Sequence, residues 1–467
     1  MNSPDITRRL QAGLGLAILL LALPNFAFAQ EGVSSMSMGA ARSGVASYSA
    51  DGRYLMPVPD LIRIEEFINY HRHDIPLPTD GKRVNLDVQA MQLDSGKTVM
   101  QFGLTTPRDL DPELVPPLNL VLVIDQSGSM QGDRIANVKL ALNSFVDRLR
   151  KHDKVCIVGF NNEASVVLEA TEKTKTKKIK RAIDKLVAGG STNLHAGLML
   201  GYQQATMSYD KERTNRVILL SDGITNTGVT NLQQIASESK SFNQEGIDLS
   251  TIGLGQNLNH QLLRDLADAG RGLIHFVGDA QDIHKTFVAE VESLLAPAAR
   301  KVRLSIDFGK HAERVKFYGY EPERNGSVFT FKLDDLNHGA TQVVMARLPK
   351  SAKGNVDGIT ATLKYKDAIN GDSVNLQSAA GDATPGRNSS INKNYAIALV
   401  AKSIKKACVD SHDSDCRGAE ERLQKGIRSA RKVLNYRSDE DIERMVDIAK
   451  DYRQNLLNSM ENRRGRD

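Results

Sequence analysis

The sequence predicts an α/β domain with a doubly wound parallel sheet, inserted in a β-sandwich-like domain and followed by a C-terminal helical region. Three observations support this order. Apolar strand-like runs alternate with amphipathic helical stretches between residues 117 and 297. Segments with apolar residues at every second position flank that region on both sides. Helical periodicity dominates from residue 394 onward.

The composition is that of a soluble, globular chain with several domains. The chain has 467 residues, of which 40% are hydrophobic and 25% are charged, so roughly two to four domains are expected. The formal net charge of +5 is too small to indicate nucleic-acid binding. Tryptophan is absent and aromatic residues make up only 5%, which disfavours base stacking. We therefore expect no nucleic-acid partner.

Residues 1–29 have the pattern of a secretory signal peptide. Arg8 and Arg9 precede a long uncharged run that ends in the small-residue pattern A-x-A, so cleavage is expected between Ala29 and Gln30. An uncleaved membrane anchor is the alternative, because the run is long enough to span a bilayer. No cysteine lies near the cleavage site, so the sequence does not predict a lipoprotein. The protein is expected to be exported.

The next part of the chain predicts two pieces of one β domain. Residues 30–83 form an N-terminal segment that precedes it. Residues 84–116 and 298–370 are β-rich, because apolar side chains alternate with polar ones, as at Val302, Leu304 and Ile306. These half-buried strands lie on both sides of the α/β unit, so we expect that unit to be an insertion.

Residues 117–297 form the α/β unit itself. Its strands are continuous apolar runs, which is typical of strands buried on both faces. The helical stretches between most of them require crossover connections and therefore parallel strands. The clearest strand-like runs lie at 118–124, 154–160, 216–222, 247–255 and 273–278.

The last part of the chain predicts a linker and then helices. Residues 371–393 are rich in Gly, Ser, Asn and Asp and are interpreted as a linker. Residues 394–467 contain three amphipathic stretches, so a helical C-terminal domain is expected, with Ser438 and Asp441 at the start of its last helix.

The chain has three cysteines. Cys408 and Cys416 bracket a short acidic turn and can close a disulfide in an oxidising compartment. A zinc site that also uses His412 is the alternative, although a fourth ligand is not evident. Cys156 lies in an apolar strand and is interpreted as a buried free thiol.

Polar side chains follow two strands of the predicted sheet and one glycine-rich turn. Asp125, Ser127 and Ser129 come directly after the first strand, Thr192 lies in GGSTN, and Asp222 ends RVILLSD. Ligands gather at the carboxyl ends of strands in open α/β sheets. Oxygen ligands alone suit a hard cation, so we expect Mg²⁺, with Mn²⁺ or Ca²⁺ as alternatives. A helix N-cap is the structural alternative for the first loop.

The motifs DQSGSM, GGSTN and LLSDG, in this order, resemble the metal-ion-dependent adhesion site (MIDAS) of a von Willebrand factor type A (VWA) domain. The resemblance covers about residues 118–295. It implies that Ser127 and Ser129 bind the metal directly, and that Thr192 does so directly or through water. The two aspartates would act largely through bridging waters. A partner protein would present an Asp or Glu to the cation.

The flanks resemble a group of bacterial exported VWA proteins. The similar segments are residues 62–78, residues 363–374 and the C-terminal helices. Some members are labelled calcium-activated chloride channel homologues, but no segment after the N-terminal run is apolar enough to form a pore. The resemblance implies a periplasmic or secreted protein of a Gram-negative-type bacterium.

These observations predict a metal-dependent protein-interaction or adhesion module without enzymatic activity. A metal-dependent hydrolase, or an envelope stress or assembly factor that uses the same site, is the alternative. A nucleophilic Ser127 or Ser129 would need a positioned base, and His195 is the best candidate. The sequence lacks G-x-S-x-G, H-E-x-x-H and the phosphate-binding P-loop.

Two further polar runs have ordinary interpretations. The basic run from Lys173 to Arg181 is interpreted as the solvated face of a helix, with contact to anionic lipids or an acidic partner as the alternative. The run from His71 to Asp74 is interpreted as a polar turn before Pro76 rather than as a metal site.

Overall fold

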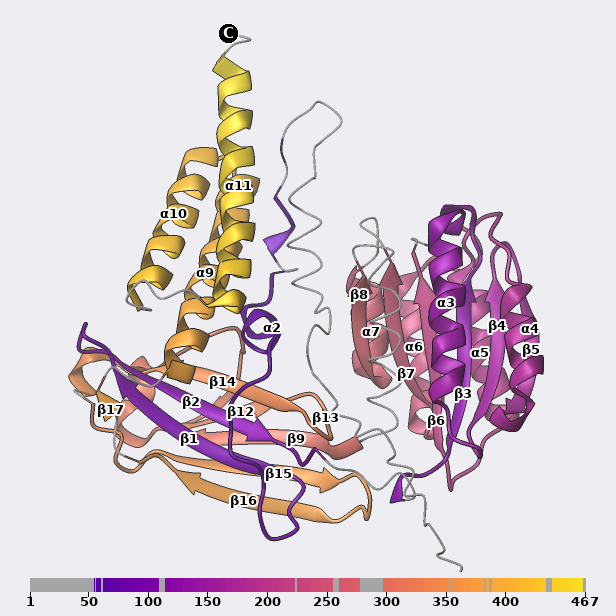
Figure 1. Cartoon of the computed structure of the whole chain (residues 1–467), viewed down its shortest axis with the longest axis horizontal. Coiled ribbons are helices and arrows are strands. Elements are labelled where there is room, and N and C mark those ends of the chain that lie inside the picture. Colours follow the sequence, from indigo (N-terminus) through magenta and orange to yellow (C-terminus); the bar gives the residue numbers. More distant parts are fainter. Residues whose placement is uncertain are drawn as a thin grey trace, which may run out of the picture.

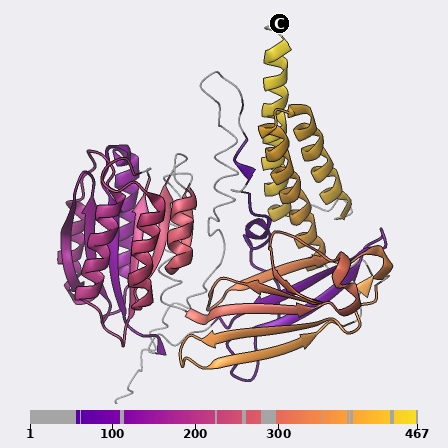
Figure 2. The ribbon, with the colours of Figure 1, turned by 180° about the vertical axis from the view of Figure 1, so that it is seen from behind.

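The computed structural model contains an α/β domain, a β domain of two sheets and a group of C-terminal helices (Figure 1). The α/β domain stands to one side of the β domain, and the helices rise from the other end of the β domain, as Figure 2 also shows from behind. The structure describes residues 54, 56–59, 62–108, 114–222, 225–254, 260–277, 297–352, 354–381, 384–385, 389–433 and 439–464. The predicted signal peptide and its cleavage residues, Ala29 and Gln30, lie outside this set.

The α/β domain contains a sheet of six strands in the order β5-β4-β3-β6-β7-β8. Five of the strands are parallel, and the chain winds outward from β3 in both directions, so the predicted doubly wound sheet is confirmed. The edge strand β5 is antiparallel to β4, because only three residues connect them and a parallel crossover needs many more. The strands are β3 (Leu118–Asp125), β4 (Lys154–Phe160), β5 (Ala164–Glu172), β6 (Thr214–Ser221), β7 (Asp248–Leu254) and β8 (Arg271–Val277).

Helices cover both faces of this sheet. Leu120 and Leu122 of β3 pack with Phe145 on one face, whereas Val121 and Val123 pack with the α5 and α6 side of the core. Because β3 is buried on both faces, its sequence is apolar throughout rather than alternating. The helices are α3 (Asp133–Arg148), α4 (Thr176–Asp184), α5 (Leu194–Met207), α6 (Leu232–Gln244) and α7 (His260–Ala269), with short 3-10 turns η3 (Gly128–Met130) and η4 (Lys173–Lys175).

The β domain combines strands from both sides of the α/β domain. Strand β2 pairs with β14, so that Phe102 lies opposite Val344, and this pairing confirms that the α/β domain is an insertion. The two sheets have the orders β10-β14-β2-β1-β17 and β11-β12-β9-β15-β16, and β13 also pairs with β9. The two sheets share one core, in which the rings of Phe102 and Phe308 meet edge to face at 6.0 Å. The strands are β1 (Asn85–Gln92), β2 (Thr98–Thr105), β9 (Pro297–Asp307), β10 (Lys316–Phe317), β11 (Glu323–Asn325), β12 (Val328–Lys332), β13 (Leu336–Asn337), β14 (Thr341–Arg347), β15 (Thr360–Asp367), β16 (Ser373–Ala379) and β17 (Thr384–Pro385).

The predicted linker is wrong in part. Residues 373–379 form β16, which pairs along its whole length with β15, and the first C-terminal helix begins at Ser389. Strand β16 lies at the edge of its sheet and buries none of its side chains fully, so its sequence is as polar as that of a loop.

The C-terminal helices form one core with the N-terminal segment. This core joins α2 (Ile64–Ile68) to α9 (Ser389–His412), α10 (Cys416–Val433) and α11 (Glu440–Arg464). The Asp439 carboxylate caps α11, because it accepts hydrogen bonds from the N–H groups of Asp441 and Ile442. Ser438, the predicted cap, lies outside the described residues. Within the described part of the chain, none of the helices has the length and apolar character needed to span a membrane.

The cysteines do not form the predicted bridge. All three are free thiols in the structure, so the predicted disulfide between Cys408 and Cys416 is wrong. Cys408 is buried in the helical core by the last turns of α9, whereas Cys416 begins α10 after a tight turn. The zinc alternative is also wrong, because Cys408, His412 and Cys416 form no group that could hold a metal among the described residues. The His412 Nε2 instead lies 3.1 Å from the carbonyl oxygen of Met56. Burial raises the pKa of the Cys156 thiol to about 12, as expected for an unreactive core cysteine.

The run from His71 to Asp74 contains two buried rings instead of an exposed turn. His73 is 4% exposed and lies between Asn69 and Asn394, whose amide groups are 3.1 and 3.2 Å from its two ring nitrogens. The His71 ring packs against His73 at a centroid distance of 4.7 Å. Because Asn394 belongs to α9, this histidine junction holds the N-terminal segment against the C-terminal helices.

Candidate functional site

The first candidate loop begins where β3 ends. Asp125 is completely buried, and its Oδ1 accepts a hydrogen bond from the N–H of Ser127 at 2.8 Å. Its Oδ2 accepts one from the hydroxyl of Ser221, the last residue of β6, at 2.7 Å. The carboxylate of Asp125 therefore fixes the start of the loop and ties it to the neighbouring strand. The helix-cap alternative is wrong, because α3 begins after Gly132 and no side chain caps it.

The hydroxyls of this loop connect to the aspartate that follows β6. The Ser127 and Ser129 hydroxyl oxygens lie 3.0 Å apart. The Ser129 hydroxyl donates a hydrogen bond to Asp222 Oδ1 at 2.7 Å. The structure thus brings four of the five predicted residues into one continuous chain of contacts, although Asp222 lies 93 residues after Ser129 in the sequence.

The glycine-rich turn joins the same edge of the sheet. The N–H of Gly128 donates to the carbonyl of Gly190 at 2.9 Å, which links the first loop to GGSTN. The N–H of Thr192, a residue only 3% exposed, donates to Asn226 Oδ1 at 2.9 Å, which links GGSTN to the segment after Asp222. The three loops therefore meet at the carboxyl ends of the central strands, as the sequence predicts.

Glycine is needed where the first loop and the turn meet. A Cβ on Gly128 would lie 3.3 Å from the carbonyl oxygen of Gly190. Gly190 has a φ of +86°, and a Cβ there would lie 2.4 Å from Asn162 Oδ1. A larger residue at Gly128 would push the two loops apart, and one at Gly190 would displace Asn162 in the turn between β4 and β5.

Arg134, which was not predicted from the sequence, adds a positive charge to the site. Arg134 Nη1 on α3 lies 2.5 Å from Asp222 Oδ2 and donates to the carbonyl of Ser129 at 3.1 Å. Its only sequence signal is a cation in the first turn of the helix after the D-x-S-x-S motif. Arg134 neutralises one of the two carboxylates at the site.

The second carboxylate has no such partner. Within the described ranges, Asp125 forms no ion pair, and its hydrogen bonds come from a backbone N–H and a hydroxyl. Burial raises the pKa of the Asp125 carboxyl, and the nearby Asp222 charge acts in the same direction. A cation beside these oxygens would offset the buried negative charge, and all the donors are the hard oxygens that Mg²⁺ prefers. The residues therefore fit a divalent cation.

The site differs from a metal centre that is built only of strong ligands. No group of three or more His, Cys, Asp or Glu side chains that could hold a metal occurs among the residues the structure describes. The candidate site instead uses two carboxylates and hydroxyl groups, which leave a cation with few charged ligands of its own.

Among the described contacts, His195 meets a glutamate rather than the serines that a general base would serve. It lies in the first turn of α5, and its Nε2 is 2.7 Å from Glu238 Oε2 on α6. This contact and a hydrogen bond from Gln234 to Glu238 lower the pKa of the Glu238 carboxyl. The arrangement holds two helices together next to the site.

A family model for the von Willebrand factor type A domain matches residues 119–289, the region that contains all three loops. The chain contains a VWA domain. Domains of this family generally mediate metal-dependent interactions with other proteins. The matched region starts in β3 and includes the six-stranded sheet.

Two curated relatives show how far the similarity extends. The chain is 31% identical to the uncharacterized protein YfbK of Escherichia coli over 300 residues, which are 61% of this chain and 51% of that protein. It is 28% identical to inter-alpha-trypsin inhibitor heavy chain H2 of Mus musculus over 207 residues, or 43% of this chain and 22% of that one. The chain thus spans about half the length of YfbK.

One solved structure is similar over most of the chain. A von Willebrand factor type A protein from Catenulispora acidiphila superimposes with a TM-score of 0.51, covering 79% of this chain and 96% of that one. The sequence identity is only 15%, so this likeness concerns the fold alone.

Proposed function

We propose that this chain is an exported module that binds a protein partner through a divalent cation at the VWA domain. The single observation that carries the proposal is the meeting of three loops around a buried carboxylate that forms no ion pair with any described residue. The proposed ion is Mg²⁺, with Mn²⁺ or Ca²⁺ as alternatives. The partner would present an Asp or Glu side chain.

Each residue of the site has a role in this proposal. Ser127 and Ser129 offer their hydroxyl oxygens to the cation, and Thr192 offers its own from the glycine-rich turn. Asp125 holds the loop through the backbone N–H of Ser127, and Asp222 accepts a hydrogen bond from the Ser129 hydroxyl and orients it. When bound, the cation supplies an electrophilic coordination position that a partner carboxylate can occupy.

Titration calorimetry with MgCl₂ and MnCl₂ tests the cation site directly. We expect one site per chain in the wild type, and an affinity at least about tenfold lower in Asp125→Ala and Asp222→Ala, because each change removes one of the two carboxylates. Asp413→Ala, an exposed aspartate between α9 and α10, is the matched control and keeps full affinity. Unchanged binding in both site variants would refute the site.

Partner capture from an envelope extract, with Mg²⁺ or with a chelator, tests the function. We expect a protein that binds in Mg²⁺, is released by the chelator, and does not bind Asp125→Ala. Capture that survives both the chelator and the substitution contradicts the proposed mode of binding.

Export is the part of the proposal that rests on the N-terminal sequence pattern. We expect a periplasmic or secreted protein whose mature chain begins at Gln30. Mass spectrometry of the protein from fractionated cells measures the mature N-terminus and its compartment. A full-length chain that stays in the membrane fraction would indicate the anchor instead.

The hydrolase alternative has no supporting geometry. His195 is engaged by Glu238 on a neighbouring helix, and none of its described contacts is to Ser127 or Ser129. We therefore propose a binding function without catalysis.

A further inference from the structure

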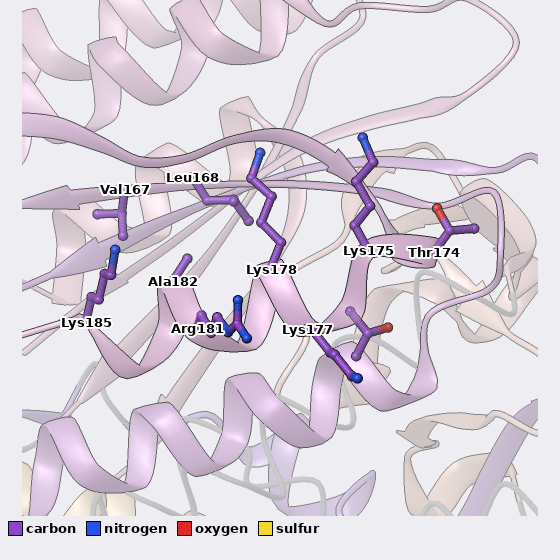
Figure 3. Close-up of a pocket in the computed structure, with 10 residues that line it drawn as sticks. Val167, Leu168, Thr174, Lys175, Lys177, Lys178, Arg181, Ala182 and Lys185 are labelled. Carbon is purple, nitrogen blue, oxygen red and sulfur yellow. The ribbon is translucent and has the colours of Figure 1, made fainter.

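The edge of the VWA sheet carries a cavity that the proposed cation site does not use. It lies between α4 and the edge strand β5 and has a volume of about 710 Å³ (Figure 3). Val167 and Leu168 of β5 and Ala182 of α4 provide apolar lining, and cationic residues make up most of the remaining lining. We call this cavity the basic groove.

The position of the cations follows from how α4 packs. Ile179 and Ile183 are completely buried against the sheet, which fixes one face of the helix inward. Lys178 and Lys185 are seven residues apart, so they lie about two turns apart along one side of the helix. In Figure 3 the side chains of Lys175, Lys178 and Lys185 project in the same direction, beside Val167 and Leu168.

The lining of the groove, as far as the structure describes it, contains cationic side chains and no acidic ones. Within the part of the chain that the structure describes, the side chains of five lining cations form no ion pair; they are Lys175, Lys177, Lys178, Arg181 and Lys185. Their neighbour Lys180 behaves differently, because it pairs with Asp147 of α3. Burial raises the pKa of Cys156, in the core on the opposite face of the sheet, and the Glu169 charge adds to this effect. Glu169 of β5 therefore acts on that face rather than on the groove.

The groove has the dimensions of an extended chain rather than of a single anion. The helical rise between Lys175 and Lys185 amounts to about 15 Å, which corresponds to roughly four or five residues of an extended peptide. Strand β5 pairs with β4 on one side only, and no other described strand pairs with it. A peptide can therefore use the backbone edge of β5, the apolar lining and the row of cations together.

The groove also leads toward the cation site. After Lys185 the chain runs directly into GGSTN, and the Gln126 side chain donates to the Val187 carbonyl at 3.0 Å. The Gln131 side chain reaches the carbonyl of Ala188, the next residue. One end of the groove therefore adjoins the first loop of the site.

We propose that the basic groove binds an extended acidic segment of a protein partner. The inference rests on the proposed function only in assigning that segment to the same partner whose carboxylate reaches the cation. Acidic side chains of the segment pair with the lysines on α4 and at its two ends. Apolar residues of the segment contact Val167 and Leu168.

Fluorescence anisotropy with a labelled eight-residue peptide of alternating Glu and Leu tests the groove by itself. The assay uses the full chain in a chelator, so that a failure of the cation site does not affect it. We expect binding that weakens as salt rises, and an affinity about tenfold lower in the triple variant Lys175→Glu, Lys178→Glu, Lys185→Glu, because charge reversal replaces attraction with repulsion.

The controls separate the groove from general electrostatics and from misfolding. The triple variant Lys151→Glu, Lys211→Glu, Lys240→Glu carries the same charge change at exposed positions of the same domain and keeps wild-type affinity for the peptide. A second groove variant with Gln at the three positions keeps the fold with a smaller change in charge, and binds with intermediate affinity.

Two outcomes would overturn the proposal. One is equal loss of peptide binding in the groove and control variants, which would mean that net charge alone matters. The other is binding to anionic phosphatidylglycerol vesicles, but not to the peptide, that depends on the same three lysines. If peptide binding behaves as expected but cation binding fails, the groove stands and the proposed function does not.

Discussion

The candidate cation site and the histidine junction both bury polar side chains that come from distant parts of the chain. At the junction, His73 meets the amide groups of Asn69 and Asn394, which are neutral. The nearest charges there are balanced, because Lys393 pairs with both Asp439 and Asp441. Its polar groups therefore hold segments together and leave no charge for a ligand.

At the cation site the described charges do not balance in this way. Two carboxylates, those of Asp125 and Asp222, lie at the meeting of the loops, and the one guanidinium described there, that of Arg134, pairs with Asp222. Burial of polar groups alone therefore does not identify a binding site. A place for a ligand differs from a structural joint in two ways: Asp125 forms no ion pair among the described residues, and loop hydroxyls lie beside the second carboxylate, Asp222.

Replacing His73 by Ala is expected to have the largest effect, a loss of stability at the histidine junction without a change at the cation site. The change leaves the amides of Asn69 and Asn394 without their ring partner and opens a buried cavity, so we expect the free energy of unfolding to fall by about 3 kcal/mol. Urea unfolding measures it. Calorimetry should show unchanged Mg²⁺ affinity in the folded variant, and a parallel loss of Mg²⁺ binding would show that the two regions are not independent.

Acidification is the second largest expected effect. Burial, followed by the charge of Lys393, lowers the pKa of His71 from 6.5 to about 4. The unfolded chain therefore binds a proton more readily than the folded chain between these pH values. The stabilisation is fully present above pH 6.5 and is lost as the pH falls toward 4, by up to about 3 kcal/mol.

Urea unfolding at a series of pH values measures this dependence. Asp439 and Asp441, which favour the protonated ring of His71, make the loss smaller. The variant His71→Gln should make the curve less steep between pH 6.5 and 4, and His73, whose pKa burial also lowers well below 6.5, accounts for the remaining dependence. An identical curve in the wild type and the variant would show that His71 is not the group responsible.

The sequence was sufficient for the strands and for the three loops, because each depends on local pattern and on the rule that parallel strands end at a shared edge. It could not show Arg134 on Asp222 or Ser221 on Asp125, since these contacts depend on how the chain folds over long separations. The same limit explains the histidine run. Its polar residues look like a turn until α9, more than three hundred residues later, covers them.

Local composition and spacing also gave two wrong predictions, the linker and the disulfide. The edge strand β16 exposes alternate residues and reads as a linker. Cys408 and Cys416 are close in sequence, but one is buried in the core of the helices while the other begins the next helix. Sequence spacing could not reveal that difference.

The substitution Arg134→Gln changes the charge at the cation site alone and is expected to have a smaller effect, on Mg²⁺ affinity. The guanidinium of Arg134 occupies Asp222 Oδ2 and places a positive charge at the site. Removing it frees one carboxylate oxygen and relieves repulsion, so we expect Mg²⁺ to bind about tenfold more tightly, or about 1.4 kcal/mol. Calorimetry measures the change, with Arg148→Gln at the other end of α3 as the control. Equal or weaker affinity in Arg134→Gln would show that the arginine does not compete with the cation.

The central claim is that a divalent cation binds between the loops that carry Ser127, Thr192 and Asp222. The most direct test is an anomalous difference map from crystals of the protein grown with MnCl₂. We expect a single strong anomalous peak about 2.2 Å from the hydroxyl oxygens of Ser127 and Ser129. Crystals of Asp125→Ala should lack this peak. A wild-type map without a peak at the meeting of these loops, at millimolar Mn²⁺, would contradict it.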